Sequence, residues 1–192
     1  ARYAEASAEI FRVFSEFSPI VEGLSLDEAY LDLSHSQRLL GEPDEIGRAI
    51  KRTVFERTAL TCSVGICAIK FVAKIAGGLD KPDGLTVVYP GDERTTLAPL
   101  KVEVLPGVGQ KTLASLHRAG IRVVADLQEL ESTRARRLLG ESADSLLAMA
   151  NARAQGVVST GRVAQQISCE DTYLVDKTEL EDLRRELLRQ ST

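Results

Sequence analysis

The residues of this chain best suited to chemistry are two adjacent carboxylates, Asp27 and Glu28. They lie between two short apolar runs, residues 20–26 and 29–33, which are typical of the two strands of a hairpin. At a tight reversal both carboxylates can lean toward one point, where two anions repel each other unless a cation lies between them. Mg²⁺ prefers carboxylates together with water and substrate phosphates, so the pair predicts a magnesium site. An acidic, solvated hairpin tip is the alternative.

A glycine-rich segment, residues 105–112 (LPGVGQKT), is the second candidate. Gly107 and Gly109 allow the backbone to approach a ligand and to adopt positive φ, and the unpaired N–H groups of the following helix favour an anion. Lys111 adds a positive charge. The spacing is not that of a P-loop and resembles a helix-hairpin-helix, a motif that implies a sequence-independent grip on a DNA backbone. An ordinary turn between packed helices is the alternative.

Three lysines follow the hairpin in the sequence. Lys70 and Lys74 are four residues apart and share one face of a predicted helix, where they could also form an ordinary solvated edge. Lys81 precedes a turn that contains proline. A cation held there could stabilise a triphosphate leaving group.

Composition limits the class of protein. The chain has 192 residues, of which 44% are hydrophobic, so it can form one or two small domains. The net charge of −4 argues weakly against a strongly basic nucleic-acid binder, yet residues 101–165 carry nine Lys/Arg against six Asp/Glu. An acidic part joined to a mildly basic part is consistent with metal chemistry beside phosphate contact.

The cysteines and the apolar runs indicate a cytoplasmic protein with no membrane partner. Cys62, Cys67 and Cys169 form no CxxC pair, so they predict buried thiols and neither a disulfide framework nor a zinc site. No apolar run is long enough to cross a bilayer, and the chain does not open with a signal peptide. Because it opens on Ala1 and directly on a helical pattern, we expect a fragment of a longer protein.

The order of predicted elements indicates an α+β fold, with a ferredoxin-like sheet that is antiparallel or mixed and has helices on one face. The predicted elements are a helix over 3–17, the hairpin, a loop over 35–43, a helix over 44–57 capped by Asp44, a buried strand over 60–68, a helix over 70–79 and a strand over 85–89.

A small all-helical region is predicted next, followed by a linker and the beginning of a further domain. Its predicted helices cover 113–119, 124–130, 132–139 and 142–153. The linker covers 154–162, a strand covers 167–175, and a charged helix capped by Thr178 runs to about Arg189.

Three blocks together resemble the Y-family DNA polymerases, most closely their DinB or DNA polymerase IV branch. The blocks are SLDEAYLD, SVGICAIKFVAKIAGGLDKPDGL and LPGVGQKT, and their order and spacing both match the family. The resemblance extends over essentially the whole chain. It implies a palm over residues 1–89, a thumb over 90–158, and over 159–192 a linker with the start of a little-finger domain.

The resemblance also implies an activity and roles for single residues. The activity is template-directed nucleotidyl transfer that tolerates damaged templates, with primer–template DNA, an incoming deoxynucleoside triphosphate and a two-metal Mg²⁺ site. Asp27 is similar to a metal-ligating aspartate, and Glu28 to its acidic partner near the primer 3′-hydroxyl. The remaining implied roles are triphosphate contact for Lys81, proximity to DNA for Lys70 and Lys74, and backbone grip by the thumb for Gly107, Val108, Gly109, Lys111 and Thr112. A sliding clamp could bind through further C-terminal sequence.

The chain also departs from the family pattern. The family begins with a strand that carries another metal-ligating aspartate, followed by fingers with a tyrosine and an arginine for the triphosphate, and nothing here matches them. Ile69 stands where the family often has asparagine. We therefore expect the whole protein to polymerise DNA and this chain alone to be inactive. The alternatives are a catalytically inactive DNA-binding accessory protein of the same family, and a palm-like nucleotide cyclase, against which the LPGVGQKT segment argues.

Overall fold

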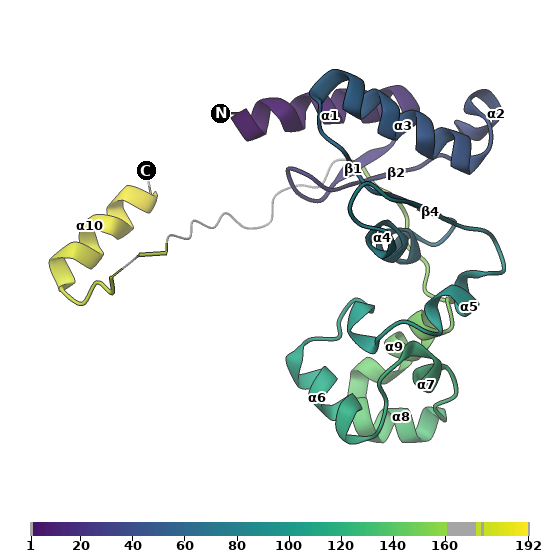
Figure 1. Ribbon diagram of the computed structural model, residues 1–192. Helices are drawn as coiled ribbons and strands as arrows, with labels where there is room; N and C mark the ends of the chain where they lie inside the picture. The colour runs from purple at the N-terminus through teal and green to yellow at the C-terminus, as the bar shows by residue number, and fades with distance from the viewer. Residues whose placement is uncertain (1, 161–171, 174, 192) are drawn as a thin grey trace. The chain divides into compact units, whose positions relative to one another are not determined.

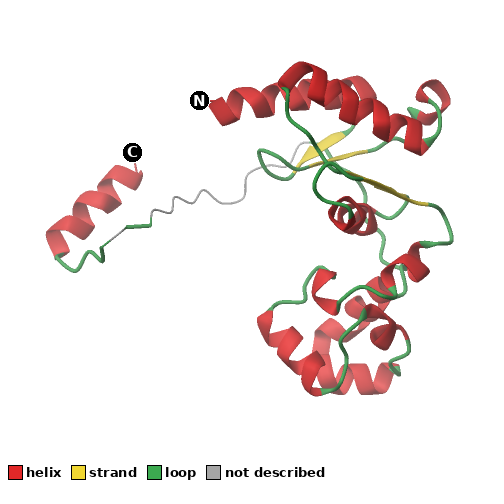
Figure 2. Ribbon diagram, in the orientation of Figure 1, coloured by secondary structure: helices red, strands yellow, loops and turns green. Residues whose placement is uncertain are grey.

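The structure, a computed structural model, describes residues 2–160, 172–173 and 175–191. It separates into two compact units, Ala1–Thr160 and Gly161–Thr192. The described part of the chain is mostly helical, with a few short strands in the first unit (Figures 1 and 2). The predicted α+β class is therefore confirmed.

Helices α1 (Arg2–Phe17) and α3 (Pro43–Thr58) pack against each other through one apolar core. Val13 of α1 is buried there with Ile46, Ile50 and Val54 of α3, the same face of α3 that the sequence predicts. Both predicted helices are confirmed.

Between these two helices the structure differs from the prediction in two details. A short helix, α2 (Gln37–Leu40), forms where the sequence predicts a loop, because four residues are too few to show helical periodicity. The N-cap of α3 is Glu42 and not Asp44. The backbone N–H of Glu42 donates to the carboxylate of Glu45 at 3.0 Å, which is one half of a capping box.

The predicted hairpin is confirmed, with shorter strands. Strands β1 (Val21–Gly23) and β2 (Ala29–Leu31) are antiparallel, and Glu22 lies opposite Tyr30. Because side chains directly opposite each other on paired strands lie on the same face, these two share one face of the hairpin. Leu31 points to the other face, where it joins the core of α1 and α3.

The second pair of strands is parallel. Strand β3 (Val64–Cys67) pairs in register with β4 (Leu85–Val88), and helix α4 (Lys70–Leu79) is the crossover that parallel strands require. The described strands thus form two two-stranded sheets where the sequence predicts one. In Figure 1 they lie between α1 and α3 on one side and α4 on the other, so helices flank both faces.

Helix α4 lies unusually close to β3, because a glycine stands on each side of the contact. A Cβ placed on Gly65 would lie 2.1 Å from the carbonyl oxygen of Ala73 and from the backbone nitrogen of Gly77. No larger residue fits at Gly65 without moving the helix. This contact fixes the distance between β3 and α4, the helix that carries Lys70 and Lys74.

The rest of the first unit is helical, as predicted for this region, and α5 is an addition that the sequence did not predict. Its elements are α5 (Glu93–Leu97), η1 (Val102–Val104), α6 (Gln110–Arg118), α7 (Val124–Gln128), α8 (Ser132–Leu139), η2 (Gly140–Ser142) and α9 (Ala143–Ala150). One hydrophobic core joins Val72 and Ala76 of α4 to Leu116, Leu127 and Leu146 of these helices. The core thus crosses the predicted boundary at residue 89, and the domain limits stay a prediction.

In the second unit the structure describes helix α10 (Leu180–Ser191), which confirms the predicted C-terminal helix. Lys177 pairs with Glu186, and this hydrogen bond, with a second from Arg189, lowers the pKa of Glu186 to about 2. The predicted strand over 167–175 and Cys169 lie mainly outside the described residues. Among the residues that the structure describes, none of the helices has the length and apolar character needed to cross a membrane.

Candidate active site and nucleic-acid interface

The two candidate carboxylates lie at the exposed tip of the β1–β2 hairpin. The tip closes where the backbone N–H groups of Leu24 and Ser25 donate to the carbonyl of Glu28 at 2.8 and 3.3 Å. The Ser25 hydroxyl donates to the carboxylate of Asp27, so this side chain is oriented by its own loop. The reversal that the sequence predicts is therefore present.

Glu28 is engaged by helix α4. Its carboxylate accepts a hydrogen bond from Lys74 Nζ at 2.8 Å, with 45% of the Glu28 side chain and 51% of the Lys74 side chain exposed. The hydrogen bond to Glu28 is the largest cause of the raised pKa of Lys74. The two neighbouring acids thus differ in partner, a serine for Asp27 and a lysine for Glu28.

The donor chemistry of this tip fits a hard cation in part. Two adjacent, exposed carboxylates offer the oxygen ligands that Mg²⁺ prefers. Within residues 2–160, 172–173 and 175–191 they are not joined by further acids, histidines or cysteines into a group of three or more that could hold a metal. The tip therefore offers part of a metal site, and the metal-binding role of Asp27 and Glu28 stays a prediction.

Sequence reasoning missed Glu22, which is the buried residue of β1. Its carboxylate pairs with Lys70 Nζ, and only 10% of the Glu22 side chain and 19% of the Lys70 side chain are exposed. The same carboxylate oxygen accepts a hydrogen bond from the backbone N–H of Ser159 at 2.8 Å. A glutamate between valine and glycine looks like a solvent-facing strand residue, so nothing in the sequence pattern marks it.

Tyr30 interacts with charged groups of both ion pairs. Lys70 Nζ is 4.8 Å from the centre of the Tyr30 ring, a distance at which a cation is attracted to the ring face. Burial raises the pKa of the Tyr30 hydroxyl, and the nearby charge of Lys74 opposes that shift. The hairpin and α4 are thus joined by two ion pairs one helical turn apart, with an aromatic ring beside the inner pair.

Lys81 lies exposed at the start of the turn between α4 and β4, apart from these pairs. Lys51 of α3 holds this turn, because its ammonium donates to the carbonyl oxygens of Cys62 at 2.8 Å and Asp83 at 2.7 Å. Gly84 has no room for a side chain, since a Cβ there would lie 2.0 Å from the carbonyl oxygen of Asp80. The position of Lys81 is therefore constrained from both sides of the turn.

The glycine-rich segment forms the exposed N-terminus of α6. Gly107 has φ +86°, as predicted, but Gly109 is the N-cap of α6 with φ −84°, so the predicted positive φ at Gly109 is wrong. The helix starts at Gln110, three residues before the predicted start. A Cβ on either glycine would meet nothing within 4 Å, so the backbone here is open to an approaching ligand.

The other residues of this segment divide between core and surface. Val108 packs against the large core, Thr112 is half-buried, and Lys111 is exposed. Helix α6 has nine residues and its first N–H groups are available for an anion, as at any helix start. Its contact with DNA stays a prediction.

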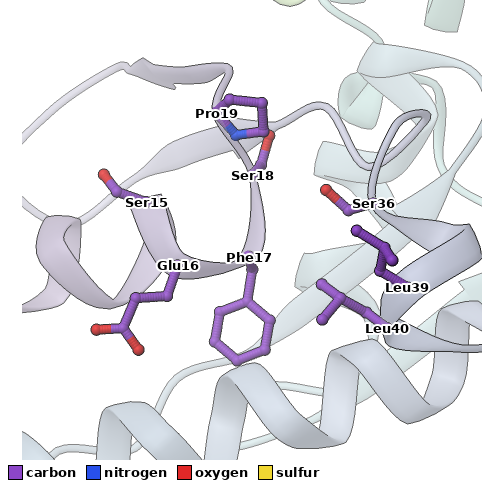
Figure 3. Close-up of a pocket in the computed structure, with 8 residues that line it drawn as sticks. All are labelled: Ser15, Glu16, Phe17, Ser18, Pro19, Ser36, Leu39 and Leu40. Atoms are coloured by element: carbon purple, nitrogen blue, oxygen red, sulfur yellow. The ribbon is translucent and has the colours of Figure 1, made fainter.

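A surface hollow lies at the C-terminal end of α1, next to the short helix α2. Figure 3 shows its lining, in which Phe17 faces Leu39 and Leu40, with Ser18, Pro19 and Ser36 around them. Leu39 is 88% exposed. None of the predicted site residues lines this hollow.

Comparison with known proteins gives a consistent set of relatives. Residues 1–78 match the impB/mucB/samB family. The chain is 40% identical over 171 residues to DNA polymerase IV of Alkalilimnicola ehrlichii, which covers 89% of this chain and 48% of that protein. It is similar in structure to DinB from Sulfolobus solfataricus, with a TM-score of 0.71 and 28% identity over 81% of this chain and 46% of that one. A Dbh DNA polymerase solved as an insertion ternary complex gives a TM-score of 0.72, also at 28% identity, over 81% of this chain and 46% of that one. The chain spans about half the length of the curated relatives it matches.

Proposed function

We propose that the whole protein is a DNA-directed DNA polymerase of the translesion type, because residues 1–78 match the impB/mucB/samB family and the chain is similar to DNA polymerase IV and to DinB. Its substrates are primer–template DNA and a deoxynucleoside triphosphate. The observation that carries the proposal is the pair of adjacent, exposed carboxylates at the hairpin tip, set in a fold shared with these polymerases.

In this function Asp27 and Glu28 would hold Mg²⁺. A divalent cation at such a site stabilises the charge that develops on the attacking and leaving oxygens during nucleotidyl transfer. The Ser25 hydroxyl orients the carboxylate of Asp27, and Glu28 would have to release Lys74 to serve as a metal ligand. We also propose that the whole protein binds a sliding clamp and is located in the cytoplasm.

Two further groups bind the substrates. Lys81, held in its turn by Lys51, places a positive charge where the triphosphate of the incoming nucleotide can be bound. The open backbone of Gly107 and Gly109 and the ammonium of Lys111 contact phosphates of the duplex, without reading its sequence.

Primer extension with Mg²⁺ by the whole protein tests the proposal. Asp27→Ala is expected to reduce the extension rate at least about a hundredfold, comparable with the loss of one electrostatic contact to a transition state. Asp44→Ala is the matched control, because Asp44 pairs only with the exposed Arg48 on α3 among the contacts described. Full extension by Asp27→Ala would contradict the assignment.

The same assay separates the enzyme from a catalytically inactive accessory protein. Fluorescence anisotropy with primer–template DNA measures binding independently of extension. If the wild-type protein binds the duplex but does not extend the primer with Mg²⁺, the accessory role is correct. If it does not bind the duplex at all, both proposals fail.

A further inference from the structure

The buried pair of Glu22 and Lys70 contacts a distant part of the chain. Residues 156–159, which follow the last helix of the first unit, return to β1 and α4 and run beside this pair. The backbone N–H of Ser159 donates to Glu22 Oε2 at 2.8 Å, and Lys70 Nζ donates to the carbonyl oxygen of Val157 at 3.0 Å. Besides pairing with each other, both charged groups therefore hydrogen-bond to backbone groups of this segment.

Packing gives a second, independent contact with the same segment. A Cβ built on Gly156 would lie 3.4 Å from both Cβ and Cδ of Lys70, so the segment passes directly over the aliphatic stem of the lysine. The side chain of Val157 is 82% exposed and adds nothing to the core. The contacts of this segment with Glu22 and Lys70 are therefore made by backbone atoms, while Val158 beside them is half-buried.

We infer that Glu22 and Lys70 form a clip that binds the backbone of residues 156–159 and fastens the end of the helical region to the hairpin carrying Asp27 and Glu28. Glu22 supplies the acceptor and Lys70 the donor, and each also neutralises the other in a buried setting where an unpaired charge is unfavourable. The clip is a positioning device. It is independent of the proposed activity, because all of its contacts lie within this chain.

The geometry of the clip is directional, which makes it testable. A charge-swapped variant, Glu22→Lys with Lys70→Glu, keeps two opposite charges in contact. The lysine at position 22 offers no acceptor to the N–H of Ser159, however, and the glutamate at position 70 offers no donor to the carbonyl of Val157. Ordinary charge pairing would survive in the charge-swapped variant, whereas the clip would not.

Hydrogen–deuterium exchange of the Ser159 amide in the 192-residue chain measures the clip. The main variant is Glu22→Met with Lys70→Met, which replaces a buried ion pair by apolar side chains of similar length and so keeps the fold. We expect Ser159 to exchange about tenfold faster or more, because a hydrogen bond to a charged acceptor is lost. The charge-swapped variant should show the same increase in the exchange rate of the Ser159 amide.

Arg57→Met is the matched control, because it removes a cation from the exposed pair with Glu16 and leaves residues 156–159 untouched. If the double variant loses cooperative unfolding, Ser159→Pro removes the single N–H, and faster tryptic cleavage after Arg153 is then the expected result. Three results would overturn the clip: an unprotected Ser159 amide in the wild-type chain, an unchanged hydrogen-exchange rate in the double methionine variant, or full protection of this amide in the charge-swapped variant. For Ser159→Pro, unchanged cleavage would do the same.

Discussion

Two ion pairs join the same hairpin to the same helix, and they differ in almost everything except chemistry. The inner pair, Glu22 and Lys70, is nearly buried and also binds backbone groups of residues 157 and 159. The outer pair, Glu28 and Lys74, is half exposed. A buried pair with all its partners in place is part of the architecture, whereas an exposed pair can give up one partner for a ligand.

The comparison assigns different roles to lysines that look equivalent in the sequence. Lys70 and Lys74 share a helix face, as their spacing predicts, but Lys70 is committed to the protein. Lys74 is half exposed and pairs only with the exposed tip of the hairpin among the ion pairs described. Breaking each pair separately should therefore give unequal effects.

The largest effect is expected for Lys70→Met. It removes the ammonium group that pairs with the buried carboxylate of Glu22, and removing one partner of a buried pair costs about 3 kcal/mol of unfolding free energy. Lys74→Met should cost less than about 1 kcal/mol, the range of exposed pairs. Urea unfolding of the two variants, followed by circular dichroism, measures both. Equal losses would show that burial does not distinguish the pairs.

At the exposed N-terminus of α6, the two glycines Gly107 and Gly109 allow a second comparison. Gly107→Ala should reduce stability by about 1 kcal/mol, because its φ of +86° disfavours any residue with a Cβ. Gly109→Ala is the control, since its φ of −84° suits alanine and the space beside it is empty. Thermal unfolding measures the difference. Equal melting temperatures would mean that positive φ at Gly107 is not required.

A smaller effect is expected in the titration of the outer pair. Because Glu28 raises the pKa of Lys74, the contribution of this pair to stability is fully present below the ordinary lysine value of 10.5 and is lost as the pH rises through the raised value. Glu28→Gln should bring the pKa of Lys74 back toward 10.5. NMR titration of the lysine side chain measures this. A pKa that does not change in Glu28→Gln would mean that the pair does not persist in solution.

The sequence predicts the features that depend on local pattern. The hairpin, the long helices α1, α3 and α4 and the shared face of Lys70 and Lys74 all follow from periodicity and turn residues. Features that depend on distant contacts are not predictable in this way. The burial of Glu22 requires Lys70 and Ser159, which lie 48 and 137 residues away, and the parallel pairing of β3 with β4 depends on how α4 crosses the strands.

Short helices and individual backbone angles are not predictable from the sequence for a different reason. Helices α2 and α5 have four and five residues, less than the length over which an amphipathic pattern repeats. Gly109 was predicted to adopt positive φ, but glycine also serves as an N-cap with ordinary angles. The presence of glycine thus indicates an open backbone without fixing its conformation.

Paramagnetic Mn²⁺, which prefers the same oxygen ligands as Mg²⁺, tests the central claim most directly. If the hairpin tip is the metal-binding part of the active site, NMR spectra of the 192-residue chain should show broadening of the backbone amides of residues 24–29 as Mn²⁺ is added, and Asp27→Asn should abolish it. The broadening of residues 24–29 should, by contrast, persist in Lys70→Met, because the inner pair does not bind the metal. Broadening of 24–29 that persists in Asp27→Asn, or broadening confined to other acidic surfaces, would contradict the account.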